Sequence, residues 1–319
     1  MTPEFDLIAK YFTRPATRAV LGIGDDCALI APPPGCELAI STDTLVSGTH
    51  FFAEADPFKL GHKALAVNLS DLAAMGASPR YVTLALTLPK IDPAWLAEFA
   101  RGFFALADAA QVDLIGGDTT RGPLSMTLTV FGEVAGGKSL RRDRALAGDD
   151  IWVSGTLGGS AMALKHVEGS TVIPIEHLES ALACLHTPIP RNALGGALVN
   201  VAHAAIDISD GLIADLAHIC ERSYLAAIID WPAVPLSSSL NSAIPEIAHA
   251  CALAGGEDYE LCFTAARDRR AEIAEIAAST GVALTRVGAM RAGNPQVTVL
   301  DAEGAPMDSP RAGFDHFST

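Results

Sequence analysis

The stretch AAIDISDGLIADL, residues 204–216, contains the pattern on which the fold depends. Residues 204–207 form a short, mainly apolar segment, which predicts a buried strand. The spacing of apolar residues over 211–221 predicts a helix. Ser209 and Asp210 lie between them, and both residue types favour a turn or the N-cap of a helix. A buried strand that leads through a polar turn into a helix is a building unit of mixed α/β domains.

The same alternation of short apolar strands and amphipathic helices continues on both sides of this stretch. Residues 124–130 alternate between apolar and hydroxyl-bearing or polar side chains, which predicts a half-buried strand. In the N-terminal half the other predicted elements are helices over 4–12, 57–75 and 94–110 and strands over 37–41 and 81–88. In the C-terminal half they are strands over 151–153, 225–230, 259–264 and 283–287 and helices over 161–167, 177–184, 191–203, 239–252 and 269–279.

Residues 135–150 are the best candidate for a linker between the two halves. They contain three glycines and a run of charged side chains, and a new strand is predicted directly after them. We therefore expect an α+β protein made of two mixed α/β domains, over residues 1–138 and 149–319. The C-terminal domain is expected to contain a mixed sheet with helices.

The composition excludes several classes of protein. The 319 residues include 37 acidic and 22 basic side chains, for a formal net charge of −15, with 50% apolar and 18% charged residues. This is the balance of a globular chain, and a sequence pI near 4.9 argues against nucleic acid or an anionic membrane as a partner. No apolar run reaches the roughly 18 residues of a membrane span, and residues 1–12 lack the apolar region of a signal peptide. The six cysteines form no C-x-x-C pair, so we expect reduced thiols and a cytoplasmic location.

The aspartates form the most informative pattern, because most of them follow a short apolar strand in a turn that contains Gly, Ser or Thr. The positions are Asp25, Asp26, Asp43, Asp71, Asp118, Asp207 and Asp210, of which Asp71 falls in a helical pattern. Turns after the strands of one sheet face a common edge, and several carboxylates there cannot all ionise without cations. Hydroxyl and carboxylate oxygens favour Mg²⁺, and no Cys and His set with zinc spacing competes. Because Mg²⁺ with few protein ligands usually completes its shell with water and phosphate oxygens, we expect a phosphate-bearing substrate.

Each aspartate taken singly also has an ordinary structural explanation. Asp210 precedes a glycine at the start of a predicted helix, Asp43 fits a turn, and Asp71 fits a solvated helix face. One of Asp25 and Asp26 is expected to serve as a cap or turn residue. The metal hypothesis therefore depends on the motifs taken together.

Two glycine-rich stretches resemble phosphate-binding loops. Residues 132–139, GEVAGGKS, fit the string G-x-x-x-x-G-K-S, but a P-loop needs a helix that starts at its lysine. The charged segment 140–148 that follows has no apolar stripe, so we interpret the string as a chance match. The second stretch, Gly22-x-Gly24, has Cys27 where the dinucleotide fingerprint needs a third glycine. The sequence also lacks G-x-S-x-G and has no Ser or Cys in a familiar nucleophile context.

Seven blocks of sequence run from near the N-terminus to the last residues of the chain. They are GIGDDCALI (22–30), STDTLVSGTHF (41–51), HKALAVNLSDLAAMGASP (62–79), GGDTTRGPL (116–124), AIDISDGLIADL (205–216), GGEDYELCF (255–263) and GFDHF (313–317). In this order they resemble the thiamine-monophosphate kinase family, which belongs to the aminoimidazole-ribonucleotide-synthetase-like superfamily. The combination of STDTLVSGTHF, NLSDLAAMGA and GGEDYELCF is specific to this family.

The resemblance implies an enzyme that phosphorylates thiamine monophosphate with ATP, giving thiamine diphosphate and ADP in thiamine cofactor synthesis. It implies several Mg²⁺ ions, with ligands at Asp26, Ser41, Thr42, Asp43, Asp71, Asp118, Asp207 and Asp210. It implies ATP contacts at Gly117, Asp118, Arg142 and Ser209, and substrate contacts at His50, Glu257 and Phe314. It also implies a homodimer whose N-terminal sheets join across the two-fold axis.

Three points stay open on the sequence alone. Arg141 and Arg144 are neighbours of Arg142, and any of the three could reach a phosphate. The family often has an aromatic nucleotide contact in the helix before the Gly-Gly-Asp turn, and residues 100–104 do not identify it. His50, a lone histidine after the Asp-containing turn, fits a structural role as well as a substrate contact.

The chemistry of the acceptor agrees with the lack of a nucleophile–base pair in the motifs. A phosphate monoester has a second pKa of about 6, so it is largely ionised at pH 7 and needs no general base. Two anions must then be brought together, and since few basic residues lie in the motifs, Mg²⁺ must supply the positive charge. Two other functions fit the pattern: an ATP-dependent ligase or synthetase of the same superfamily, and a non-catalytic regulator that binds metal and nucleotide.

Overall fold

The computed structural model describes residues 6–308 of the chain. The chain divides into two compact units, the first comprising residues 6–72 and 77–137 and the second residues 73–76 and 138–308. Each unit contains one sheet, of four strands in the first and six in the second. Among the helices of residues 6–308, none combines the length and apolar character that a bilayer crossing requires.

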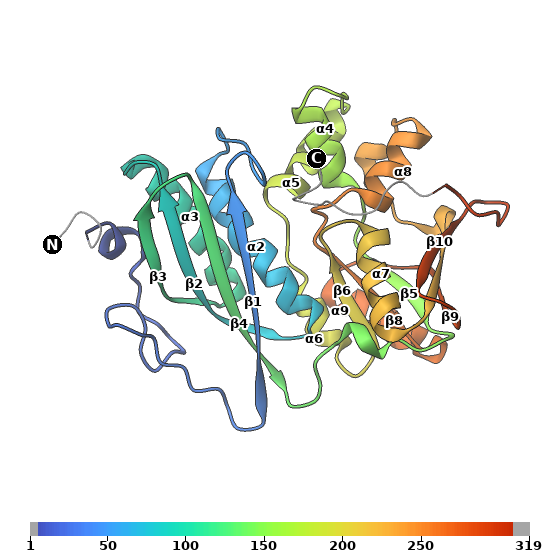
Figure 1. Cartoon of the computed structure of the whole chain (residues 1–319), viewed down its shortest axis with the longest axis horizontal. Coiled ribbons are helices and arrows are strands. Elements are labelled where there is room, and N and C mark those ends of the chain that lie inside the picture. Colours follow the sequence, from blue (N-terminus) through green and yellow to red (C-terminus); the bar gives the residue numbers. More distant parts are fainter. Residues whose placement is uncertain (1–5, 309–319) are drawn as a thin grey trace. The chain divides into compact units, whose positions relative to one another are not determined.

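The sheet of the first unit has the strand order β1-β4-β2-β3 (Figure 1). The strands β1 (Cys36–Val46) and β2 (Ser78–Leu88) both pair antiparallel with β4 (Ser125–Ala135). The fourth strand, β3 (Asp113–Arg121), pairs parallel with β2. The strands β1 and β3 are therefore the two edges of this sheet.

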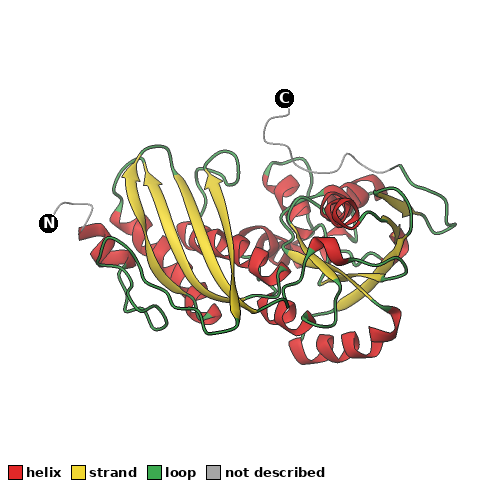
Figure 2. Ribbon diagram, turned by 60° about the horizontal axis from the view of Figure 1, so that its bottom comes forward, coloured by secondary structure: helices red, strands yellow, loops and turns green. Residues whose placement is uncertain are grey.

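The helices α2 (Pro57–Ala74) and α3 (Pro93–Ala110) lie on one face of this sheet, and none of the unit's described helices covers the other face (Figure 2). The two helices approach each other closely, because glycine stands where they meet. A Cβ atom at Gly61 of α2 would lie 2.1 Å from the carbonyl oxygen of Phe99 in α3. This close packing holds α2, which carries one of the predicted metal ligands, against α3.

The alternation in β4 separates the two faces of the sheet, as predicted. Leu128 and Val130 are fully buried on the face that the helices cover. Thr127 points to the opposite face, where its hydroxyl hydrogen-bonds to that of Thr44 over 2.8 Å. The first unit therefore has one apolar face under the helices and one open face that carries hydroxyl groups.

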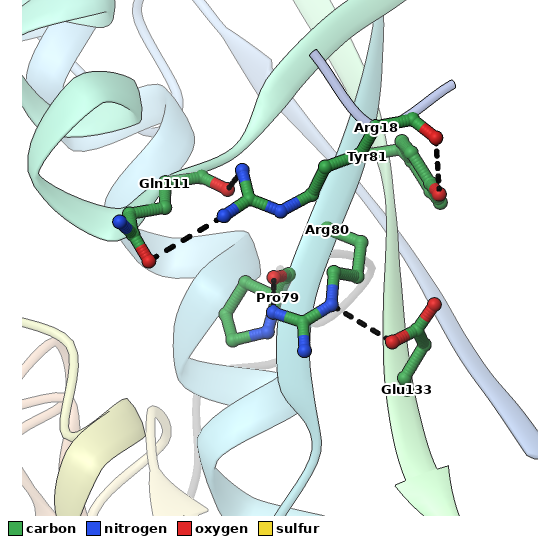
Figure 3. A network of polar contacts seen from close by, with 6 residues as sticks. All are labelled: Arg18, Pro79, Arg80, Tyr81, Gln111 and Glu133. Atoms are coloured by element: carbon green, nitrogen blue, oxygen red, sulfur yellow. Dashed lines mark hydrogen bonds and ion pairs between the residues drawn. The ribbon is translucent and has the colours of Figure 1, made fainter. Parts of the chain in front are cut away.

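A polar network joins the segment before β1 to the sheet (Figure 3). Arg80 lies at an irregularity in the pairing of β2 with β4 and donates to Glu133 over 2.8 Å. The hydroxyl of Tyr81 donates to the carbonyl of Arg18 over 3.3 Å, and the Arg18 guanidinium donates to the carbonyl of Gln111 over 2.9 Å. These contacts attach the irregular N-terminal segment to β2 and to Gln111, the residue that follows α3.

The second unit is built on a mixed sheet in which one outer pair of strands is parallel and the other pairs are antiparallel. In spatial order its strands are β10 (Gln296–Leu300), β7 (Ala226–Asp230), β9 (Leu284–Arg291), β5 (Asp150–Ser154), β8 (Glu260–Ala265) and β6 (Ala204–Ile208). Its helices are α4 (Gly159–Val167), α5 (Ile175–His186), α6 (Asn192–Leu198), α7 (Leu212–Ser223), α8 (Pro245–Ala254) and α9 (Arg270–Thr280). Apolar clusters lie on both faces of this sheet, one with Ile206 and Leu216 and the other with Phe263 and Ile273. The predicted combination of two mixed α/β sheets is confirmed.

Short helical turns complete the structure. They are η1 (Ile8–Phe12), a π-helix within the longer helix predicted at the N-terminus, and the 3₁₀ turns η2 (Arg142–Arg144), η3 (Trp231–Ala233), η4 (Ser238–Leu240) and η5 (Arg267–Arg269). The helix predicted over 191–203 is shorter and ends at Leu198, and the one predicted over 239–252 begins later, at Pro245.

Strands account for the main differences from the prediction. The strand predicted over 37–41 continues to Val46, and β3 and β10 were not predicted as strands. In β1 polar residues point to both faces of the sheet, and in β3 Asp118 points to the open face, so these edge strands lack the apolar run of a buried strand. Gly116 and Gly117 also suggested a turn, whereas both lie inside β3.

Candidate active site

The C-terminal half of β1 faces the C-terminal half of α2, and three of the predicted metal ligands meet there. Ser41 and Asp43 are two residues apart in β1, so their side chains point to the same face of the sheet. The hydroxyl of Ser41 donates a hydrogen bond to the carboxylate of Asp71 in α2. The main-chain N–H of Asp43 donates over 3.1 Å to the side-chain oxygen of Asn68, one turn before Asp71. We call Ser41, Asp43 and Asp71 the β1–α2 carboxylate cluster.

The electrostatics of this cluster favour a bound cation. Burial, together with repulsion from Asp71, raises the pKa of Asp43 from 3.8 to about 6. Two partly buried carboxylates this close repel each other unless a proton or a cation neutralises one of them. Their oxygens and the Ser41 hydroxyl form a hard donor set of the kind that Mg²⁺ prefers. Within residues 6–308, no group of three or more His, Cys, Asp or Glu side chains is arranged as a metal site.

The prediction that Asp43 and Asp118 lie in turns at a common edge is wrong. Asp43 lies inside β1 and Asp118 inside β3, and these strands form opposite edges of the sheet. In the strand register, Asp43 is paired with Leu128 on the buried face. Asp118 is aligned through Ala85 with Thr127 on the open face. The two side chains are therefore separated by the width of the sheet and by its two faces.

Thr42 and Gly117 have different surroundings from Asp43. The hydroxyl of Thr42 hydrogen-bonds to that of Thr129 over 2.9 Å on the open face. Gly117 has a φ of 148°, and a Cβ atom there would lie 1.8 Å from the carbonyl oxygen of Leu84. Only glycine fits this position, because β2 passes too close for a side chain.

Two further predicted residues of the first unit lie in loops. The carboxylate of Asp25 accepts the main-chain N–H of Asp26 over 2.8 Å, so Asp25 is the one of the pair that serves as a turn residue. Asp26 itself is exposed. His50 follows β1, and its Nδ1 accepts the N–H of Val46 over 3.1 Å. In the neutral ring the proton is therefore on Nε2, which makes this atom a hydrogen-bond donor.

In the second unit, Asp207 is buried in β6 and Asp210 lies in the loop between β6 and α7. This loop is held from inside by Asp215 of α7. Its carboxylate accepts the N–H groups of Ser209 and Asp210, both over 3.0 Å, and of Gly211 over 3.1 Å. Burial raises the pKa of Asp215 to about 7, although these hydrogen bonds act in the opposite direction.

Glu257 lies in the loop between α8 and β8, which packs against the 209–211 loop. Its N–H donates to the carbonyl of Ser209 over 2.8 Å, and its own carbonyl accepts the hydroxyl of Ser160 over 2.7 Å. Glu257 and Tyr259 have φ values of +68° and +50°, a conformation uncommon for residues other than glycine. Backbone strain of this kind is concentrated at functional sites.

Carboxylates on either side of Tyr259 hold this strained loop in place. Asp258 accepts the N–H of Gly158 over 2.8 Å at the start of α4, and burial raises its pKa to about 8. Glu260 is buried and accepts a hydrogen bond over 2.8 Å from the guanidinium of Arg191. The loop that carries Glu257 is thus connected to α4 and to the residue before α6.

Two of the three arginines of the linker differ in their contacts. The guanidinium of Arg141 pairs with Asp143 over 2.8 Å. The guanidinium of Arg142 is exposed and forms no ion pair with any residue that the structure describes. The hydroxyl of Ser223 in α7 donates to the carbonyl of Arg142 over 2.7 Å and so fixes the turn.

The P-loop string at residues 132–139 is a chance match, as predicted. Its first residues belong to β4, and no helix begins at Lys138, which is followed only by the three-residue turn η2. The Lys138 ammonium donates to the side chain of Asn200 over 2.8 Å. The segment therefore lacks the amides and helix dipole that hold phosphates in a P-loop.

Two of the aromatic side chains in the helix before the Gly-Gly-Asp segment have partners inside the first unit. Phe103 is fully buried, and the guanidinium of Arg14 lies over the ring of Phe104 at 3.6 Å. Phe314, expected to contact the substrate, lies outside the described residues.

Asn68 and Asp215 are not among the predicted site residues, although the sequence carries a signal for the position of each. Asn68 precedes Asp71 by three residues, so the two share one face of a helix. Asp215 lies on the apolar stripe of α7, between Leu212 and Ile219, where a carboxylate needs internal partners.

This chain is similar to known proteins over almost its whole length. Residues 24–134 match the family AIR synthase related protein, N-terminal domain, and residues 147–300 match AIR synthase related protein, C-terminal domain. The thiamine-monophosphate kinase of Escherichia coli (strain K12) is 47% identical over 321 residues, covering 99% of this chain and 98% of that protein. The crystal structure of thiamine-monophosphate kinase from Stenotrophomonas maltophilia K279a is 48% identical with a TM-score of 0.85, covering 92% of this chain and 94% of that one. The structure of AaThiL complexed with AMPPCP and TMP is 28% identical with a TM-score of 0.78, covering 90% and 89%. The chain therefore belongs to the thiamine-monophosphate kinase family of the AIR synthase related proteins.

Proposed function

We propose that this chain phosphorylates thiamine monophosphate with ATP, giving thiamine diphosphate and ADP. Identity of 47% to a thiamine-monophosphate kinase over 99% of the chain supports the substrate pair. The observation in the structure that carries the proposal is the β1–α2 carboxylate cluster. Two partly buried carboxylates that repel each other favour a bound cation. A cation held there could neutralise the phosphate groups of the two substrates.

We propose that Mg²⁺ ions bind this chain, and the chemistry of the donors supports that choice of metal. All of the proposed ligands are hard oxygen donors, as Mg²⁺ requires. They are Asp26, Ser41, Thr42, Asp43, Asp71 and Asp118 in the first unit and Asp207 and Asp210 in the second. When bound, Mg²⁺ supplies the positive charge that lets a phosphate acceptor approach the triphosphate.

The residues of the chain bind and orient the two substrates, and none of them needs to remove a proton. For ATP we propose contacts from Gly117, Asp118, Arg142 and Ser209, and for thiamine monophosphate from His50, Glu257 and Phe314. The Nε2–H of His50 can donate to a phosphate oxygen, since its Nδ1 is occupied by Val46. The carboxylate of Glu257 can attract the cationic thiazolium ring. Catalysis then consists of holding two anions in line for transfer.

We propose that the enzyme is a homodimer and that Asp118 acts in the site of a second copy. Within one chain, Asp43 and Asp118 lie on opposite edge strands, about 14 Å apart by three strand spacings. Edge strands present unpaired N–H and C=O groups to another chain. If the β1 edge of one copy pairs with the β3 edge of the other, the width of the sheet no longer separates Asp43 from Asp118 of the second copy. Ile40 of β1 supports this arrangement. Its apolar side chain is 59% exposed on the open face, and a second copy joined at the β1 edge could cover it.

We propose a cytoplasmic location for the reaction. All six cysteines are free thiols, and several are buried in the second unit, as expected in a reducing compartment. The cytoplasm also supplies the ATP that the reaction consumes.

Product analysis with the purified chain tests this function. Incubation with ATP, Mg²⁺ and thiamine monophosphate should give thiamine diphosphate and ADP in equal amounts. Release of inorganic phosphate with a new C–N bond would instead identify a ligase or synthetase of the same superfamily. Binding of ATP without turnover of thiamine monophosphate at any Mg²⁺ concentration would identify a regulator.

A further inference from the structure

The loop over residues 209–211 is shaped by Asp215, a residue outside the proposed set of ligands and substrate contacts. Asp215 is 3% exposed and lies in the first turns of α7. Three successive N–H groups, from Ser209, Asp210 and Gly211, converge on one of its carboxylate oxygens over 3.0 to 3.1 Å. These N–H groups point toward Asp215. The carbonyl oxygen of Ser209 accepts a hydrogen bond from a residue outside the loop.

That carbonyl oxygen connects the loop to Glu257. It accepts the N–H of Glu257 over 2.8 Å, the first contact between the two loops. The loops also pack without spare room, since a Cβ atom at Gly256 would lie 2.5 Å from the same oxygen. On the other side, a Cβ atom at Gly211 would lie 2.8 Å from the main chain of Ala254. A displacement of the 209–211 loop would therefore move the Glu257 loop as well.

We propose that Asp215 is a positioning residue that sets the 209–211 loop for ATP and Mg²⁺ and, through Ser209, sets Glu257 for thiamine monophosphate. This inference rests on the proposed function, which places Ser209 and Asp210 at the nucleotide and Glu257 at the acceptor. One buried carboxylate thereby couples the geometry of both substrate contacts. The amides of residues 209–211 depend on Asp215, because its carboxylate accepts all three of them.

The substitutions Asp215→Asn and Asp215→Ala test this proposal in the full chain. Asn keeps one acceptor oxygen in nearly the same volume, whereas Ala removes every acceptor from the three N–H groups. Loss of a group that orients metal or nucleotide ligands typically costs 10- to 100-fold in affinity or activity. We therefore expect the dissociation constant for AMPPCP with Mg²⁺ to rise about 10-fold in Asp215→Asn and about 100-fold in Asp215→Ala. Calorimetry measures this binding without any turnover.

Steady-state kinetics test the coupling between the two loops. In Asp215→Asn, the KM values for ATP and for thiamine monophosphate should rise together, each about 10-fold. Glu221→Gln is the matched control, because Glu221 lies on the same helix with its side chain 65% exposed, and this variant should behave like the parent. Circular dichroism and thermal melting establish that the variants are folded.

The outcomes separate this proposal from the proposed function. If the parent turns over thiamine monophosphate while Asp215→Asn keeps AMPPCP affinity and both KM values within about twofold, the positioning role is overturned and the function stands. A rise in the KM for ATP alone would overturn the link to Glu257. If the parent shows no turnover but Asp215→Asn weakens AMPPCP binding, the function fails and the role of Asp215 at the nucleotide loop stands. If Asp215→Ala does not fold, the AMPPCP affinity and the KM values of Asp215→Asn decide whether Asp215 is a positioning residue.

Discussion

The β1–α2 carboxylate cluster and the 209–211 loop use aspartate in opposite ways. In the cluster, Asp43 lies close to Asp71, and burial with this repulsion raises the Asp43 pKa to about 6. In the loop, Asp215 receives three N–H groups from its own chain. A carboxylate with internal donors shapes the backbone, whereas one that faces another carboxylate needs a cation from outside. The hydrogen-bond partners of a buried aspartate therefore indicate whether it builds a site or binds a ligand.

Removal of one carboxylate from the cluster should have the largest effect on activity. We expect Asp43→Asn to lower kcat by roughly two to three orders of magnitude, the consequence of losing several kcal/mol of charge stabilisation by metal. The free energy of unfolding should not fall, because the repulsion between Asp43 and Asp71 is relieved. Kinetics and urea unfolding of the same preparation measure both quantities. Glu37→Gln, also on β1, is the control, and activity of Asp43→Asn near that of the control would contradict the metal role.

A heterodimer of two inactive variants tests whether Asp43 and Asp118 act in the same site across two copies. Asp43→Asn and Asp118→Asn should each be nearly inactive as homodimers. Co-expressed with different affinity tags and purified as a heterodimer, they should recover roughly half of the parent activity, because one of the two sites is then intact. If both residues act within one chain, the heterodimer stays as inactive as either variant.

The pH dependence of stability should reveal the buried carboxylates of the second unit. Burial raises the pKa of Asp258 from 3.8 to about 8, so between these values the folded chain keeps a proton that the unfolded chain has lost. The contribution to the free energy of unfolding is complete below about pH 4 and is lost as the pH rises to about 8. Asp258→Asn cannot lose this proton, so its urea midpoint should fall less steeply than that of the parent from pH 5 to pH 8. The exposed Asp268→Asn serves as control and should keep the slope of the parent.

The smallest effect is expected at the residue that resembles a P-loop lysine. Lys138 bonds only to the side chain of Asn200 among the contacts that the structure gives it, and it is exposed. Lys138→Ala should change the KM for ATP less than about twofold and stability by less than about 0.5 kcal/mol, as at other surface sites. A large loss of ATP affinity would revive the P-loop interpretation.

Much of the fold could be predicted because local patterns and tertiary structure agree in the second unit. The strand and helix on either side of Ser209 have the predicted type and nearly the predicted bounds, since the strand is mainly apolar and the helix has an apolar stripe. The first unit was harder, because its edge strands leave one face open and carry polar residues on it. Asp43 and Asp118 fit turns in the sequence, the first because β1 carries polar residues on both faces and the second because it follows two glycines, although both lie inside strands.

The candidate site could be predicted only as a set of residue types. The aspartate motifs and their order along the chain identify hard oxygen donors, and the structure groups Ser41, Asp43 and Asp71 as one of these sets. The roles of Asn68 and Asp215 could not be assigned from their spacing, because each depends on which backbone N–H groups lie opposite. Periodicity can place a polar residue on a buried face, but it cannot name the partner that satisfies it.

The sequence by itself determined the family, the alternation of strands and helices, the acidic and oxygen-rich chemistry, and the accidental nature of the P-loop string. These properties depend on residue identity and on contacts between near neighbours in the chain. Only the tertiary structure decided that Asp43 meets Asp71, that Asp118 belongs to the opposite edge, and that Asp215 supports the loop of Ser209 and Asp210. The reason is physical: strand register and helix packing set the distances between charges, and these distances depend on the whole sheet rather than on any local stretch.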